Sequence, residues 1–195
     1  WGLERQMAID VIPILADGIK WLGYLPGKRI FWNIGLFTDW LSKGQSFSTY
    51  KWQFASRVGW LPVFSPQTNK VLHIGFNYRY GKVADGEIQL RSRPEANPAP
   101  YFISTGKFET THSNHIGYEI YYKSGPFMIG SEYYWHNFSS SKTGNPVFNG
   151  GEIMMSYLLT GESRPYHTST GILGFVPVKK SVFKGGKGAI EAVFR

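Results

Sequence analysis

Long runs of alternating apolar and polar residues constrain this sequence more than any other feature. The clearest run is Val71–Tyr80, where apolar residues occupy every second position and His73, Gly75, Asn77 and Arg79 lie between them. Successive side chains of a β-strand point to opposite faces of the sheet, so this run predicts a strand with one apolar and one polar face. An amphipathic helix would instead repeat its apolar residues at every third or fourth position.

The same period recurs along most of the chain, with Gly, Pro, Asn and Ser clusters between the runs. It predicts nine strands: Ile19–Tyr24, Ile30–Phe37, Tyr50–Pro62, Val71–Tyr80, Glu87–Arg93, Ile116–Lys123, Phe127–His136, Ile153–Leu159 and Ile190–Arg195. A further short strand around Tyr101–Ser104 would bring the two longest connections, Pro94–Asn114 and Gly161–Gly186, to the same end of the sheet.

The length of these runs favours a membrane barrel. Several reach ten residues, which exceeds the ~5 to 6 typical of globular strands and suits the ~9 to 11 of a tilted transmembrane strand. No stretch approaches the ~20 apolar residues of a membrane-spanning helix. Aromatic residues also fall near the ends of runs on the apolar face, as at Trp52 and Tyr80, where a barrel meets lipid headgroups.

We therefore predict an all-β fold, a transmembrane antiparallel up-and-down β-barrel. The alternative is a soluble β-sandwich, such as a carbohydrate-binding module, because the inward face of a sandwich produces the same alternation.

The polar faces carry many charged side chains, which a barrel would turn toward a water-filled lumen. The chain has 21 Lys and Arg against 13 Asp and Glu, a formal net charge of +8. Arginine suits an anion path because its planar guanidinium keeps its charge and offers several donors to phosphate or carboxylate oxygens. The residues predicted to form this path are Lys51, Arg57, Arg79, Arg91, Arg93 and Lys123. Arg91 and Arg93 would stand about 7 Å apart along one strand, twice the rise per residue.

Acidic side chains on the same polar faces are predicted to pair with these cations. They are Glu87, Glu119, Glu132, Glu152 and Glu191. Charged residues that face a lumen commonly pair across strands, so each arginine either contacts passing anions or holds the wall together through such a pair. In the connection Gly161–Gly186, we expect Glu162 and Arg164 to clasp the connection to the wall.

Other classes of site and function lack their signatures. The chain has no cysteine, and its five histidines do not have the spacing of metal ligands, so we predict no metal and no cofactor. No Gly-rich phosphate loop, nucleophile elbow or HExxH motif is present, and we predict that the protein is not an enzyme. Glu119 and Glu132 would be the carboxylate pair of a glycosidase, but the sequence gives no independent sign of a substrate cleft or a perturbed acid. Basic residues are interleaved with apolar runs rather than gathered on a solvated stripe, which argues against a nucleic-acid partner.

A series of short sequence motifs, in a fixed order along the chain, carries a resemblance to a known family. They are Glu4-Arg5, Arg57-Val58-Gly59-Trp60-Leu61-Pro62-Val63, Leu72-His73-Ile74-Gly75, Tyr78-Arg79-Tyr80, Arg91-Ser92-Arg93-Pro94-Glu95, Thr105-Gly106-Lys107, Gly117-Tyr118-Glu119, Gly125-Pro126-Phe127, Glu132-Tyr133, Leu159-Thr160-Gly161-Glu162-Ser163-Arg164-Pro165-Tyr166 and Gly188-Ala189-Ile190-Glu191. The phrase from Leu159 to Tyr166 is the most specific. In order and spacing, nearly the whole chain resembles the phosphate-selective porin O and P family of Gram-negative outer membranes.

This resemblance implies a barrel of about sixteen strands, embedded in outer-membrane lipid and assembled as a homotrimer. It implies a passive channel for small hydrophilic solutes, biased toward anions such as phosphate or polyphosphate by lumenal arginine and lysine. The nine predicted strands would then be an interior to near-C-terminal part of that barrel, with residues 1–195 forming one partial domain that continues beyond both ends. Two alternatives remain open: a small closed barrel of eight to ten strands, and an accessory subunit of a larger outer-membrane complex.

Overall fold

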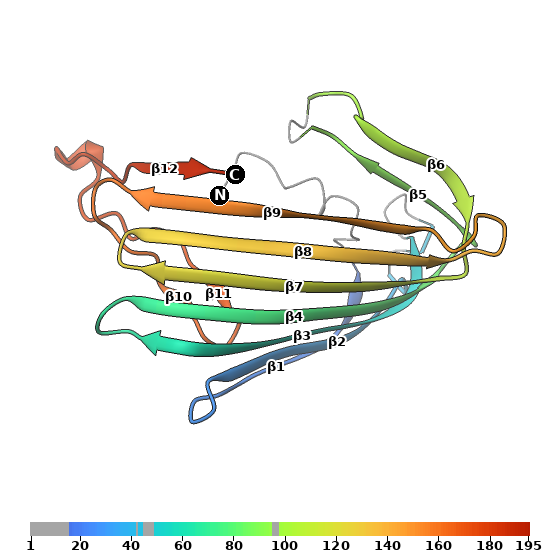
Figure 1. Ribbon diagram of the computed structural model, residues 1–195, viewed down its shortest axis with the longest axis horizontal. Helices are drawn as coiled ribbons and strands as arrows, with labels where there is room; N and C mark the ends of the chain where they lie inside the picture. Colours follow the sequence, from blue (N-terminus) through green and yellow to red (C-terminus); the bar gives the residue numbers. More distant parts are fainter. Residues whose placement is uncertain (1–15, 42, 45–48, 95–97) are drawn as a thin grey trace.

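Eight antiparallel strands form one sheet in the computed structural model, which describes residues 16–41, 43–44, 49–94 and 98–195. The strands are β1 (Asp17–Leu25), β2 (Ile30–Thr38), β3 (Tyr50–Ser65), β4 (Lys70–Val83), β7 (His112–Ser124), β8 (Phe127–Ser139), β9 (Val147–Leu158) and β12 (Glu191–Phe194). Each strand pairs with the next of these in chain order, so the sheet runs up and down from β1 to β12 (Figure 1). The all-β, antiparallel up-and-down architecture expected from the alternation is confirmed.

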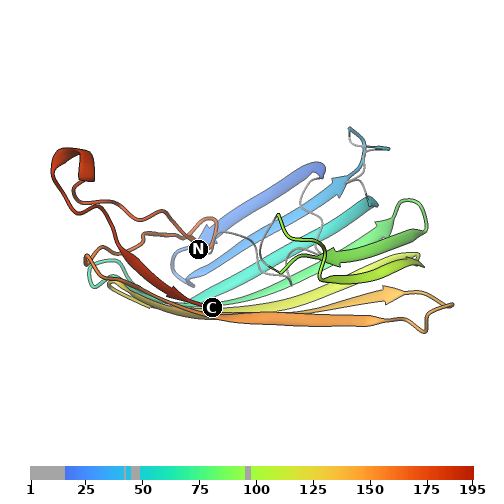
Figure 2. The same cartoon turned by 90° about the horizontal axis from the view of Figure 1, so that it is seen from above.

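The sheet is bent into an open trough, with β1 and β12 at its edges (Figure 2). Two small hairpins lie on the inner, concave face at opposite ends of the strands (Figure 1). One pairs β5 (Glu87–Ser92) with β6 (Ile103–Glu109), and the other pairs β10 (Tyr166–His167) with β11 (Ile172–Leu173). A single 3-10 turn, η1 (Val182–Lys184), follows β11 among the described residues.

Each hairpin is held by its own apolar cluster on the inner face. Ile88 and Leu90 of β5 pack on Tyr50, Val83 and Phe138. At the other end, Tyr166 of β10 packs on a cluster of Phe31, Leu61 and Val71. In the described part of the chain, the core therefore consists of two separate patches between the sheet and the hairpins that cover it.

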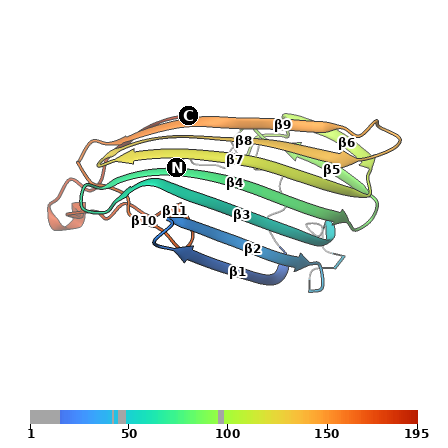
Figure 3. The ribbon, with the colours of Figure 1, turned by 60° about the horizontal axis from the view of Figure 1, so that its bottom comes forward.

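The outer face of the sheet is apolar and uncovered. Phe76 in the middle of β4 is 52% exposed and Ile153 in β9 is 65% exposed, whereas the inward-facing His73 and Met128 are 1% and 2% exposed. A soluble sandwich requires a second layer over the apolar face, and the described strands form no such layer (Figure 3). The aromatic pair Trp52 and Tyr80, expected near strand ends, lies on the outer face with its ring centroids 5.2 Å apart.

The predicted strand Glu87–Arg93 is correct as a strand but wrong as part of the wall. It forms β5, which pairs only with β6 and lies on the inner face, so that β4 and β7 become neighbours in the main sheet. The predicted short strand near Tyr101 corresponds to β6, but it enters as the partner of β5. The two longest connections consequently lie at opposite ends of the sheet, contrary to expectation (Figure 1).

Within the described part of the chain, no helix has both the length and the apolar character needed to cross a membrane.

Candidate functional site on the inner face

A partly buried ion pair joins three strands at the centre of the inner face. Arg57 of β3 donates from Nε to Glu119 Oε1 of β7 at 2.6 Å, and His73 Nε2 of β4 lies 3.0 Å from the same oxygen. Glu119 lies over Gly75, where a Cβ atom would come within 2.2 Å of Oε1. Of the two roles expected for Arg57, the structure gives it pairing across strands with Glu119.

The same residues hold the connection between β9 and β12 against the sheet. Arg57 Nη1 and Nη2 donate to the carbonyl oxygens of Thr170 and Gly171, both at 2.8 Å. The Tyr166 hydroxyl lies 2.7 Å from His73 Nδ1, and burial raises the pKa of Tyr166 above its ordinary value, which keeps the hydroxyl protonated. The hydroxyl can therefore donate to Nδ1, which leaves the Nε2 proton of His73 for Glu119.

Further contacts fix the rest of this connection. Lys123 donates to the Arg164 carbonyl at 2.7 Å and is only 4% exposed, so this predicted member of the anion path lies beneath the connection instead of bordering open solvent. Arg164 donates to Glu191 Oε2 at 2.5 Å and to the Gly174 carbonyl at 3.3 Å, which ties the connection to β12. Glu162 instead accepts a hydrogen bond from Thr160 within the connection.

The remaining wall carboxylates also have partners. Glu132 of β8 accepts hydrogen bonds from the hydroxyls of Tyr121 and Tyr134. Glu152 of β9 lies 3.6 Å from the guanidinium of Arg195. Two of the predicted acidic partners thus face an arginine: Glu191 of β12 pairs with Arg164 of the connection, and Glu152 of β9 pairs with Arg195. Glu132 instead faces two tyrosines.

Arg79 has different surroundings from Arg57. It donates from Nε to Gln53 Oε1 at 2.7 Å, and its guanidinium carbon lies 4.2 Å from the ring centroid of Tyr50. Its Nη1 and Nη2 atoms are buried and have no hydrogen-bond partner in the part of the chain that the structure describes. Arg79 is 7% exposed, and the side chains that it contacts in the described structure, Gln53 and Tyr50, are neutral. It is therefore a buried cation with neutral neighbours.

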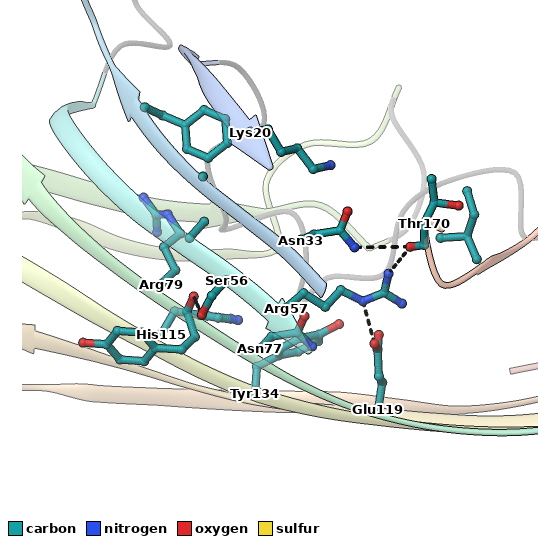
Figure 4. A pocket seen from close by; sticks show the side chains of 15 residues that line it. Lys20, Asn33, Ser56, Arg57, Asn77, Arg79, His115, Glu119, Tyr134 and Thr170 are labelled. Atoms are coloured by element: carbon teal, nitrogen blue, oxygen red, sulfur yellow. Dashed lines mark hydrogen bonds and ion pairs between the residues drawn. The ribbon is translucent and has the colours of Figure 1, made fainter. Parts of the chain in front are cut away.

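A pocket of about 530 Å³ lies between these two arginines (Figure 4). Lys20, Asn33, Arg57, Arg79, His115 and Glu119 contribute its polar lining. Figure 4 shows the guanidinium of Arg57 turned toward Thr170 and Glu119, and Arg79 set apart from that pair. Asn33 Oδ1 and His115 Nδ1 are also buried without a hydrogen-bond partner among the described residues.

The β5–β6 hairpin carries the other predicted arginines, which are not wall residues. Arg91 and Arg93 do not step along the strand as predicted, because both guanidinium groups lie against the ring of Tyr101, at 4.4 Å and 4.7 Å from its centroid. Glu87, predicted as a wall partner, lies 4.0 Å from Lys107 on the same hairpin, and both side chains are exposed.

Lys51 lies at an irregularity in the pairing of β3 with β4. Tyr50 takes the inner position there, with its hydroxyl 2.9 Å from Ser113 Oγ, and Lys51 is exposed. An extra residue in one strand reverses the faces on either side of it. A strict period of two therefore misplaces this lysine.

Sequence reasoning missed two amide side chains at this site, Asn33 of the pocket lining and Gln53, which accepts the hydrogen bond from Arg79. The alternation puts both on polar faces, but uncharged amides do not stand out among so many polar residues. The partners of a charge depend on strand register, which the alternation does not specify beyond the choice of face. Among the described residues, no group of three His, Asp or Glu side chains is arranged to hold a metal ion.

Comparison with known proteins places the chain among bacterial membrane proteins. The sequence model of the family described as phosphate-selective porin O and P matches residues 19–195. The chain is also similar to an uncharacterized protein of Caulobacter vibrioides, with 27% identity over 134 residues. That match covers 66% of this chain and 27% of the relative, so the chain spans about a quarter of the relative's length.

Proposed function

This chain belongs to the phosphate-selective porin O and P family, a family of outer-membrane porins, and we propose that it forms part of a passive, water-filled channel for small hydrophilic solutes. The observation that carries the proposal is the separation of the two faces of one sheet. The outer face is apolar and exposed, while the inner face holds the buried charged side chains of Arg79, Glu119 and Lys123. A barrel that meets lipid outside and water inside has this arrangement.

The channel is proposed to favour anions such as phosphate or polyphosphate. Three carboxylates of the inner face, those of Glu119, Glu152 and Glu191, are each in an ion pair. The contacts of Arg79 within the described residues are with the neutral side chains of Gln53 and Tyr50, and Arg91 stacks on the neutral ring of Tyr101. These two cations support the anion bias, because positive charge on the inner face raises the local concentration of anions.

The proposed location is the outer membrane of a Gram-negative bacterium, with lipid against Phe76, Ile153 and their neighbours on the outer face. A homotrimer is the proposed assembly. Mass determination of the purified protein in detergent, by light scattering, would give three chains per particle if this is correct.

Electrical recording of the intact protein tests the channel and its selectivity together. In a planar lipid bilayer with a KCl gradient, we expect discrete conductance steps and a reversal potential that indicates chloride permeation. Replacing both Arg91 and Arg93 by alanine should move the reversal potential toward zero, because the hairpin loses two positive charges.

Lys107→Ala provides a matched control on the same hairpin, since Lys107 is exposed and lies beside Glu87. A reversal potential that indicates cation preference would overturn the anion bias but leave the channel intact. Absence of any conductance from correctly folded protein would overturn the channel itself.

A further inference from the structure

We propose that the pocket between Arg57 and Arg79 binds a small organic carboxylate, with the carboxylate on the two terminal nitrogens of Arg79. The inference deepens the proposed function and rests on it, because solutes reach the inner face through the channel. It names a class of solute that the channel holds in transit, distinct from inorganic phosphate.

The first argument is the geometry of Arg79. Its Nε is occupied by Gln53 Oε1, and one face of its guanidinium is covered by the ring of Tyr50. Nη1 and Nη2 form the remaining edge of the guanidinium, and both atoms are buried without a hydrogen-bond partner in the described structure. A buried donor without an acceptor is unfavourable, and a carboxylate satisfies two such donors at once. The edge is therefore shaped for an acceptor with two oxygens.

The second argument is the charge at the pocket floor. Arg57 contributes no net charge there, because Glu119 pairs with it and two backbone carbonyls accept its remaining donors. Lys20 lies at the rim and is exposed, so solvent screens its charge. Arg79 is thus the one buried positive charge of the described lining, which matches a singly charged carboxylate better than a phosphate dianion.

The third argument is the remainder of the lining. Phe37, Ala55 and Ile172 give the pocket apolar surface that would contact the body of an organic solute. Asn33 Oδ1 is an acceptor that lacks a donor among the described residues. A hydroxyl group on the solute would supply that donor. The pocket therefore suits a carboxylate that carries an apolar body and a hydroxyl group.

Binding of 4-hydroxybenzoate tests the proposal directly. Saturation-transfer NMR on the intact protein in detergent micelles should detect binding, and an equal concentration of orthophosphate should not displace the probe. Arg79→Lys keeps the charge but loses the paired donors, and should weaken binding by roughly tenfold or more. Lys107→Gln, which removes an exposed charge outside the pocket, should leave the affinity unchanged.

The neutral analogue 4-hydroxybenzamide makes the test independent of folding in the variants, because it has the same shape and lacks the charge. It should bind at least about tenfold more weakly to the unaltered protein. Equal binding of the amide, equal binding in Arg79→Lys, or displacement by equimolar phosphate would each overturn the carboxylate site. Probe binding that persists in a protein without anion-selective conductance would overturn the proposed channel function instead.

Discussion

Arg57 and Arg79 lie on neighbouring strands of the same face, yet their neighbours give them different roles. Arg57 meets a carboxylate and two carbonyl oxygens, while Arg79 meets an amide oxygen and an aromatic ring. The alternation predicts that both side chains face inward. It does not predict their partners, because Glu119 reaches Arg57 across the intervening strand β4 at a position that only the register determines.

Glu162 gives a pH-dependent prediction at the scale of one residue. The hydrogen bond from Thr160, aided by Lys179, holds the pKa of Glu162 below its ordinary value of about 4.3. The ionised form is thus favoured in the folded state, so its contribution to stability is present above the ordinary pKa and is lost as the pH falls through the lowered one. Thr160→Val should raise the pKa of Glu162 toward the ordinary value.

Titration of the labelled Glu162 carboxyl carbon by NMR measures this change. Thr143→Val is a suitable control, because the Thr143 hydroxyl bonds to Ser140 and lies in a different connection. An unchanged pKa in Thr160→Val would assign the shift to Lys179 instead.

At the scale of elements, the wall strands were predictable and the hairpins on the inner face were not. The run Glu87–Arg93 alternates as the wall strands do, because Ile88 and Leu90 also need a buried face. For β5 that face is the inner surface of the sheet, whereas for the wall strands the apolar face points outward. Local alternation indicates that a strand has one apolar and one polar face, but it does not indicate which sheet the strand joins.

Leu90 tests how firmly the β5–β6 hairpin is held. Leu90→Ala removes buried methyl groups from the cluster under the hairpin and should weaken its attachment by about 2 to 5 kcal/mol. In bilayer recordings, the open-state current should become larger and noisier, because the hairpin spends time away from the inner face. Ile103→Ala, at an exposed position of β6, should leave the current unchanged. A steady, unaltered current in Leu90→Ala would show that the hairpin does not narrow the channel.

At the scale of the whole molecule, the sequence predicts which side of the sheet faces outward because one face is almost continuously apolar. The sequence does not predict the number of strands in the same way, because the alternation of one segment carries no information on how many strands close a barrel. Eight strands lie in the described sheet, and the total of about sixteen stays a prediction.

A charge on the outer face should therefore lower the stability of the folded protein more than the same charge at the next residue, which faces inward. Phe76→Arg puts a guanidinium at the middle of β4 toward lipid, and should cost about 2 to 4 kcal/mol of stability in a bilayer. Asn77→Arg faces the inner side and should cost much less. Urea unfolding of the two variants from lipid vesicles compares them, and equal losses would contradict the assignment of faces.

The two hairpins lie at opposite ends of the strands, so a solute that crossed the proposed channel would meet two obstructions in series. A long, stiff molecule would have to clear both at once, whereas a short or jointed one can clear them in turn. The channel would then select solutes by rigidity as well as by charge. A flexible chain would permeate faster than a rigid molecule of the same cross-section.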